Sequence, residues 1–191
     1  MAELNLNRRA FFTLALLVFP LVAQARDANW AKPVIIAGLP NLNQVAPNLY
    51  RSAQPTAEGF VAAQSTLKVL TVINLRESQT DAVLLKDVQI EEQSVPMNAM
   101  DIKEADVISA LKLIKAGEAK GPVLVHCKHG ADRTGVVIAM YRILYQGWSK
   151  TQAIDEMKHG GFNFHSVFFN IPTFVKNADI AVYKQALAIS P

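Results

Sequence analysis

Short runs of β-branched residues alternate along the chain with stretches that place apolar residues at helical spacing. The runs 68–75 (KVLTVINL) and 123–125 (VLV) are typical of buried strands, whereas apolar residues recur every three or four positions over 104–119. Such alternation predicts a mostly parallel sheet covered by helices. We therefore expect a single α/β domain with a central, mostly parallel sheet flanked by helices.

Turn residues and helix-capping residues divide the rest of the chain. They predict a helix that begins after Thr56, strands at 34–37, 48–51 and 92–97, and helices at 78–88, 134–145, 151–159 and 172–187. Ligands of parallel sheets bind beyond the carboxyl ends of the strands. The polar residues expected at that edge are Arg51, Arg76, Asp101 and Cys127.

Residues 1–25 have the composition of a signal peptide. Arg8 and Arg9 precede the apolar run 10–23, and the run ends in the small-residue cleavage pattern Ala-Gln-Ala. The run is shorter than the ~20 residues of a membrane-spanning helix, so we expect cleavage after Ala25 and no membrane span afterwards. The predicted products are a signal peptide, 1–25, and a periplasmic domain, 26–191. The sequence around the two arginines fits both the Sec and the twin-arginine export routes.

The predicted mature chain is nearly neutral. It contains 17 basic and 15 acidic side chains, which argues against nucleic acid or an anionic membrane as a partner. Cys127 is the only cysteine, so no internal disulfide can form. An unpaired thiol in an exported protein indicates reactivity rather than a structural role.

Cys127 lies in the segment 126–135 (HCKHGADRTG), between a predicted strand and a predicted buried helix. The amides of such a loop and of the first helical turn can converge on a bound anion. Gly130 permits a tight backbone, and Arg133 can hold two phosphate oxygens with its planar guanidinium. Because amides and the helix dipole stabilise a thiolate, we expect the pKa of Cys127 to lie below the ~8.5 of a free thiol.

The pattern His-Cys-x5-Arg-Thr-Gly resembles the active-site loop of the cysteine-based protein tyrosine phosphatase superfamily. The segment 48–55 (NLYRSAQP) and the export signal resemble the bacterial periplasmic dual-specificity type, and the resemblance extends over about residues 48–162. It implies a dual-specificity-phosphatase-like fold and hydrolysis of phosphotyrosine in a protein substrate, with phosphoserine and phosphothreonine as further possibilities. The sequence gives no indication of the oligomeric state.

The resemblance also implies a two-step mechanism that needs no metal or other cofactor. Cys127 attacks the phosphorus while an acid protonates the leaving oxygen, and water then hydrolyses the cysteinyl-phosphate. Thr134 would donate a hydrogen bond to the sulfur, and His126 would orient the loop backbone. The residues expected to bind or surround the phosphoryl group are Lys128, His129, Gly130, Ala131, Asp132 and Arg133.

Two aspartates compete for the role of general acid. Asp101 follows a predicted strand and lies upstream of Cys127, where the superfamily has its acid. Asp106 lies near the start of the predicted helix 104–119, where the helix dipole alone explains an acidic residue. We therefore expect Asp101 to act as the acid.

Several alternatives remain open at this point. A rhodanese-like sulfurtransferase, a phosphoinositide or small-phosphomonoester phosphatase, and a non-catalytic phosphate-binding module all use an anion-binding loop. Ala131 and Asp132 disfavour a highly charged head group, because the carboxylate repels it. A metal site made by His126, Cys127 and His129 is also disfavoured, because neighbouring residues of a strand point to opposite faces.

Overall fold

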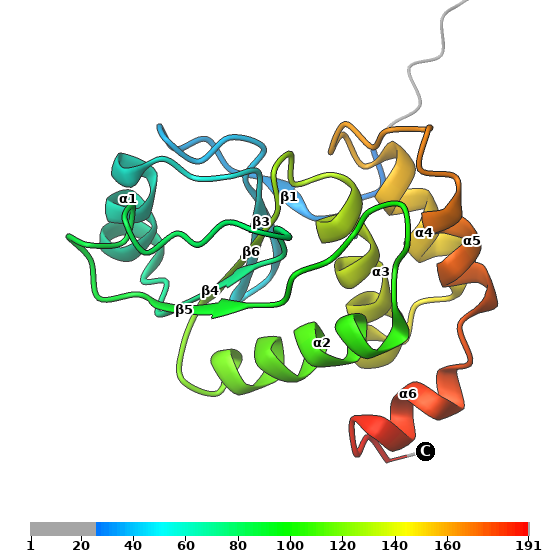
Figure 1. Cartoon of the computed structure of the whole chain (residues 1–191). Helices are drawn as coiled ribbons and strands as arrows, with labels where there is room; N and C mark the ends of the chain where they lie inside the picture. The colour runs from blue at the N-terminus through cyan, green and yellow to red at the C-terminus, as the bar shows by residue number, and fades with distance from the viewer. Residues whose placement is uncertain (1–25, 191) are drawn as a thin grey trace, which may run out of the picture.

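The computed structural model describes residues 26–190, in which one six-stranded sheet is combined with six helices (Figure 1). The strand order is β1-β2-β3-β6-β4-β5, antiparallel from β1 to β3 and parallel from β3 to β5, which confirms the mostly parallel sheet. The strands are β1 (Lys32–Pro33), β2 (Asn43–Ala46), β3 (Leu49–Ser52), β4 (Thr71–Asn74), β5 (Glu91–Ser94) and β6 (Val123–His126).

Helices cover both faces of the sheet, as expected for an α/β fold (Figure 1). Leu124 of β6 packs in one apolar cluster with Phe60 of α1, whereas Val123 and Val125 pack in another with residues of α2 and α3. This alternation buries β6 from both sides at the centre of the parallel strands. The helices are α1 (Ala57–Leu67), α2 (Glu104–Glu118), α3 (Asp132–Gln146), α4 (Lys150–His159), α5 (Asn170–Asn177) and α6 (Ile180–Ala186).

The helix predicted over 78–88 is wrong, and this segment forms turns. The side chain of Asn74 donates to the carbonyl of Gln79 at 2.8 Å, and the amide of Asp81 donates to Glu92 Oε1 at 2.8 Å. Asn74 and Glu92 thus form hydrogen bonds with a backbone carbonyl and a backbone amide that would pair with other backbone groups of the same segment inside a helix. The apolar spacing of the segment therefore reflects partial burial of turns rather than one face of a helix.

Two other predicted elements differ from the structure. The segment 34–37 is not a strand, because the chain leaves the sheet after Val34 and turns at Gly38, which has a positive φ of 78°. The predicted helix 172–187 is split into α5 and α6 at Ala178, which has extended backbone. Lys150 stabilises the break, since its Nζ donates to the carbonyls of Lys176 and Ala178. The predicted cap at Thr56 is confirmed by its hydrogen bond from the amide of Gly59.

A buried ion pair joins α3, α4 and the first strands. Arg142 donates to both carboxylate oxygens of Glu156, at 2.8 and 2.6 Å, and to the carbonyl of Val45. Glu156 also accepts from the amide of Ala31. Both charged groups are therefore hydrogen-bonded to groups of other elements, and the pair holds α3 and α4 against β2 and the segment before β1.

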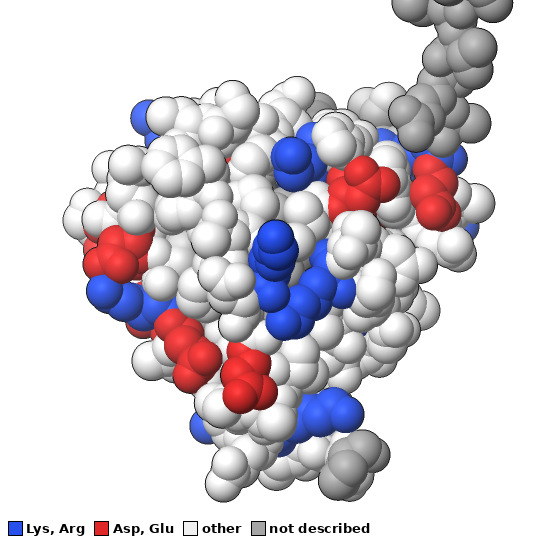
Figure 2. Space-filling view, turned by 90° about the vertical axis from the view of Figure 1, so that its right-hand side faces the viewer, with Lys and Arg blue, Asp and Glu red and all other residues white. Residues whose placement is uncertain are grey.

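The predicted signal peptide lies outside the described residues. Within residues 26–190 no helix is long and apolar enough to cross a membrane. The face drawn in Figure 2 contains basic side chains near its middle and acidic side chains around them. This mixture agrees with the nearly balanced charge of the sequence.

Candidate active site

The catalytic loop, residues 127–131, connects the central strand β6 to the start of α3. Cys127 directly follows β6 and is 1% exposed, at the base of the loop. Arg133 lies in the first turn of α3. The structure therefore confirms the predicted order of strand, cysteine loop and buried helix.

The carbonyl groups of the loop are all held by donors from outside it. Gln54 N donates to Lys128 O at 3.3 Å and Asn41 Nδ2 donates to His129 O at 3.0 Å. Arg51 donates to the carbonyls of Gly130 and Ala131, at 2.6 and 3.4 Å. The carbonyl of Cys127 lies 3.3 Å from Nδ1 of His126.

This arrangement determines where the amides of the loop point. In a trans peptide the N–H group points opposite to the preceding C=O group, so outward carbonyls turn the amides of residues 128–132 toward the interior of the loop. Within residues 26–190, none of these five amides donates a hydrogen bond to another protein group. Successive free amides facing one point form an anion-binding nest.

Gly130 is required for this backbone. Its φ is +68°, and a Cβ atom at this position would lie 2.4 Å from the carbonyl carbon and oxygen of Ser52 and 2.5 Å from the amide nitrogen of Ala53. Both the backbone conformation and the space exclude a side chain. The loop thus packs closely on the end of β3.

Arg51 is a structural part of the loop. Its side chain is buried, and the guanidinium lies 3.7 Å from the ring centre of Phe162. Burial lowers its pKa to about 10, against the opposing effect of nearby Glu156 and Cys127, so it stays charged at neutral pH. Arg51, which the sequence places at the edge of the sheet, thus holds the last two carbonyls of the loop.

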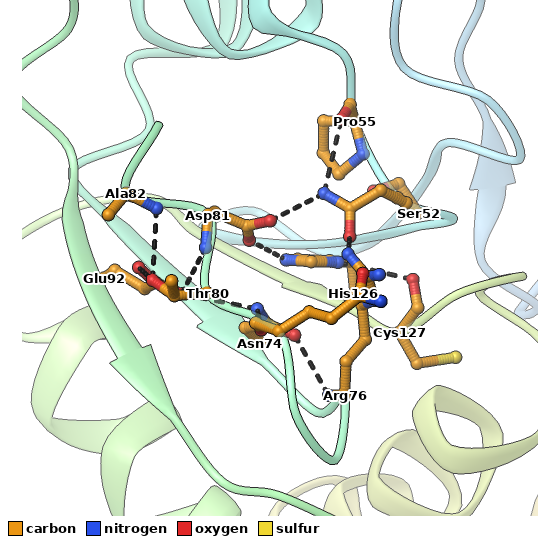
Figure 3. A network of polar contacts seen from close by, with 12 residues as sticks. Ser52, Pro55, Asn74, Arg76, Thr80, Asp81, Ala82, Glu92, His126 and Cys127 are labelled. Carbon is orange, nitrogen blue, oxygen red and sulfur yellow. Dashed lines mark hydrogen bonds and ion pairs between the residues drawn. The ribbon is translucent and has the colours of Figure 1, made fainter. Parts of the chain in front are cut away.

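His126 connects the loop to a chain of buried polar groups (Figure 3). Its Nε2 lies 2.7 Å from Asp81 Oδ2, and both side chains are fully buried. The other ring nitrogen, Nδ1, lies beside the Cys127 carbonyl, so the ring links the Asp81 carboxylate to the first carbonyl of the loop. Gln54 and Glu92 hold Asp81 in turn.

Two of the predicted loop residues are exposed, and a third, Asp132, is buried. Lys128 and His129 are exposed. The pKa of His129 is lowered by partial burial and by the nearby His165. Asp132 does not bond Arg133; its carboxylate accepts from the backbone and ring of His165, at 3.0 and 2.8 Å.

The hydrogen bond expected from Thr134 is absent in residues 26–190. Its hydroxyl is buried and makes no hydrogen bond within the described residues, so the bond to the Cys127 sulfur is not formed in this structure. Arg133 rests against the carbonyl of Met97 at 3.3 Å. This contact places the segment after β5, four residues before Asp101, beside the first turn of α3.

The two candidate acids lie on different elements. Asp101 is in the turn before α2, exposed, with Lys103 at 2.6 Å. Asp106 lies in the first turn of α2. Met97, which Arg133 contacts, precedes Asp101 by four residues, whereas α2, which contains Asp106, packs on α3 and β6.

A model of the tyrosine phosphatase family matches residues 38–187. The chain belongs to the tyrosine phosphatase family. It is 39% identical over 166 residues to the dual specificity protein phosphatase TpbA of Pseudomonas aeruginosa, over 87% of this chain and 74% of that protein. It is 28% identical over 159 residues to an inositol diphosphatase of Arabidopsis thaliana, over 78% and 74% of the two chains.

Solved structures of the family have the same fold. A substituted form of P. aeruginosa TpbA in complex with pTyr superimposes with a TM-score of 0.77 and 38% identity, over 87% of this chain and all of that one. The core catalytic domain of a PP-IP phosphatase of S. cerevisiae, in complex with citrate, superimposes with a TM-score of 0.69 and 26% sequence identity. The match covers 81% of this chain and 94% of that one. These likenesses confirm the dual-specificity-phosphatase-like fold.

Sequence reasoning missed the residues that hold the loop from outside. Asn41 and Asp81 lie 88 and 45 positions from their partners His129 and His126 and have no local pattern that marks them. Two further residues of this support lie in the segment 48–55, which is quoted above for the family resemblance. They are Arg51 and Gln54.

Proposed function

We propose that the protein hydrolyses phosphotyrosine in protein substrates through a cysteinyl-phosphate on Cys127. The observation that supports this most strongly is the outward pairing of five successive carbonyls, from Cys127 to Ala131. It leaves the amides of the loop free for the equatorial oxygens of a phosphoryl group above the sulfur. The family membership and the pTyr complex of a relative support the same activity.

In the first step, the sulfur of Cys127 attacks phosphorus and the bond to the tyrosine oxygen breaks. Asp101 donates a proton to that oxygen. Arg133 leaves the carbonyl of Met97 and binds two phosphoryl oxygens, which stabilises the charge of the transition state. In the second step, water attacks phosphorus, the Asp101 carboxylate takes a proton from that water, and the thiolate of Cys127 leaves. The hydroxyl of Thr134, which has no partner within the described residues, would then donate to the departing sulfur.

The test is the hydrolysis of an aryl phosphate by the purified protein. Cys127→Ser should abolish turnover, and Asp101→Asn should reduce kcat by about 10²–10⁴-fold, most strongly for substrates with poor leaving groups. Asp106→Asn is the matched control and should retain activity. Full activity of Cys127→Ser would refute the mechanism, and loss in Asp106→Asn alone would reassign the acid.

An inositol polyphosphate is the second candidate substrate. The Asp132 carboxylate, which would repel a highly charged ligand, is paired with His165 rather than pointed at a substrate. Relatives named inositol diphosphatases support the same alternative. Comparison of kcat/KM for a phosphotyrosine peptide and an inositol pyrophosphate decides between them, and we expect the peptide to be preferred.

We also propose that the protein acts in the periplasm after removal of residues 1–25. The twin arginines, the apolar run and the Ala-Gln-Ala pattern support this. Expression in a Gram-negative host should yield a periplasmic protein whose N-terminal residue is Arg26. A product that begins at Met1 in the cytosolic fraction would contradict it.

A further inference from the structure

Three side chains of types that can bind metals meet beside the catalytic loop, two of them close in sequence and the third 33 positions further on. They are His129 of the loop, Asp132 at the start of α3, and His165 between α4 and α5. The two imidazole rings lie 5.1 Å apart, and one donor atom from each residue lies within 4.8 Å of the others. Two imidazoles and a carboxylate are a donor set that zinc and related ions bind in proteins.

We propose that His129, Asp132 and His165 form a binding site for a divalent transition-metal ion of the zinc class. Metal–ligand bonds of about 2.0–2.2 Å in tetrahedral geometry separate neighbouring ligand atoms by roughly 3.3–3.6 Å. Asp132 Oδ2 and His165 Nδ1 are 2.8 Å apart, so this pair has to open by about 0.5–0.8 Å. The fourth coordination position is left to solvent.

Two of the three ligands are held in place by the fold. Asp132 is 4% exposed, and its Oδ1 accepts from the amide of His165. This bond also fixes the backbone of His165. The Oδ2 of Asp132, which lies 2.8 Å from His165 Nδ1, is the oxygen that would bind the ion. The carbonyl of His129 is held by Asn41, while its ring is exposed and can rotate to complete the site.

The other histidines of the chain do not offer an equivalent site. The sequence contains four, and His126 is buried with both nitrogens facing acceptors. His159 is exposed and pairs with Asp155 alone, at 2.6 Å. Within residues 26–190, His129, Asp132 and His165 form the only group of three such donors.

The thiol of Cys127 is a competing ligand for soft metal ions, so the experiment removes it. Zn²⁺ is titrated calorimetrically into the untagged Cys127→Ser protein, and Co²⁺ reports the coordination geometry by its visible absorption. We expect one ion per chain and a tetrahedral Co²⁺ spectrum. Absence of binding would overturn the proposal.

Variants in the same Cys127→Ser background locate the site. His165→Ala should lower the affinity for Zn²⁺ at least tenfold, and His129→Ala should do the same. The His129 side chain makes no hydrogen bond within the described residues, so its removal leaves the fold intact. His159→Ala is the matched control and should bind as the parent does.

The site would be refuted if the affinity for Zn²⁺ were unchanged in both His129→Ala and His165→Ala. It would also be refuted if binding were lost only in His159→Ala. These measurements use a protein without the catalytic thiol. Their failure would therefore leave the proposed phosphatase activity untouched, and the ion takes no part in the hydrolysis described above.

Discussion

At the scale of single residues, Gly130 determines whether the catalytic loop can form. Gly130→Ala should reduce kcat/KM strongly and lower the free energy of unfolding by about 1–3 kcal/mol, because it adds both a strained φ and a steric clash. The measurements are steady-state kinetics and denaturant unfolding.

Gly147 provides a matched control for this substitution. Its φ is +71°, close to that of Gly130, but a Cβ atom there would meet nothing within 4 Å. Gly147→Ala should therefore cost about 1 kcal/mol of stability and leave kcat/KM unchanged. Equal effects on activity at the two positions would show that the close approach to Ser52 is unimportant.

Asp81 is the second residue whose support of the loop can be tested by a single substitution. Asp81→Asn replaces the carboxylate that contacts His126 and should lower the free energy of unfolding by about 1.5–3 kcal/mol. It should also lower kcat/KM, because His126 loses the contact that holds its ring beside the Cys127 carbonyl. Chemical denaturation and turnover of an aryl phosphate measure the two effects.

Asp87→Asn is the control for Asp81→Asn. Asp87 is exposed and lies in the same segment of turns, so its substitution should change stability by less than about 0.5 kcal/mol. If Asp81→Asn behaved in the same way, the buried polar chain would have no part in holding the loop.

The residues that perform the chemistry could be predicted from the sequence, and those that support them could not. Cys127, Gly130 and Arg133 lie within seven positions of one another, between a strand and a helix, so one local pattern contains them. Asn41 and Asp81 reach the loop only after the sheet has assembled. Asp132 was predicted as a loop residue, but its partner His165 is 33 positions away.

At the scale of secondary structure, the pair Arg142–Glu156 should be the most costly polar contact to break. Glu156→Ala leaves a buried guanidinium without its carboxylate and should lower the free energy of unfolding by about 3–5 kcal/mol. Thermal or denaturant unfolding followed by circular dichroism measures this change.

The exposed pair Lys120–Glu91 is the comparison for Glu156→Ala. Both side chains are about half exposed, so Glu91→Ala should change the free energy of unfolding by no more than about 1 kcal/mol. A similar loss in both variants would mean that the buried pair contributes no more than a surface contact.

Helices and strands could be predicted from the sequence where the spacing of apolar residues matches the face that the element buries. The strand β6 and the helices α2, α3 and α4 agree with their predicted ranges to within two residues at each end, because burial follows their periodicity. The pattern over 78–88 has the same spacing, yet Asn74 and Glu92 bind its backbone instead. Side-chain contacts between distant segments cannot be deduced from local spacing.

At the scale of the whole molecule, the order of elements explains why the site is formed. Parallel pairing of β3, β6 and β4 brings Ser52, His126 and Asn74 to the same edge of the sheet, in register. The loop after β6 is therefore enclosed by segments that follow both neighbouring strands. Arg51 and Gln54 approach it from one side, and Asp81 from the other.

The amides of the loop can be tested directly by NMR. Inorganic tungstate, a tetrahedral dianion, is titrated into ¹⁵N-labelled Cys127→Ser protein while amide resonances are followed. The account predicts that the largest shifts occur at residues 128–132 and that Arg133→Lys weakens binding at least tenfold. Tungstate that binds without moving these five amides, or that shifts resonances elsewhere instead, would contradict it.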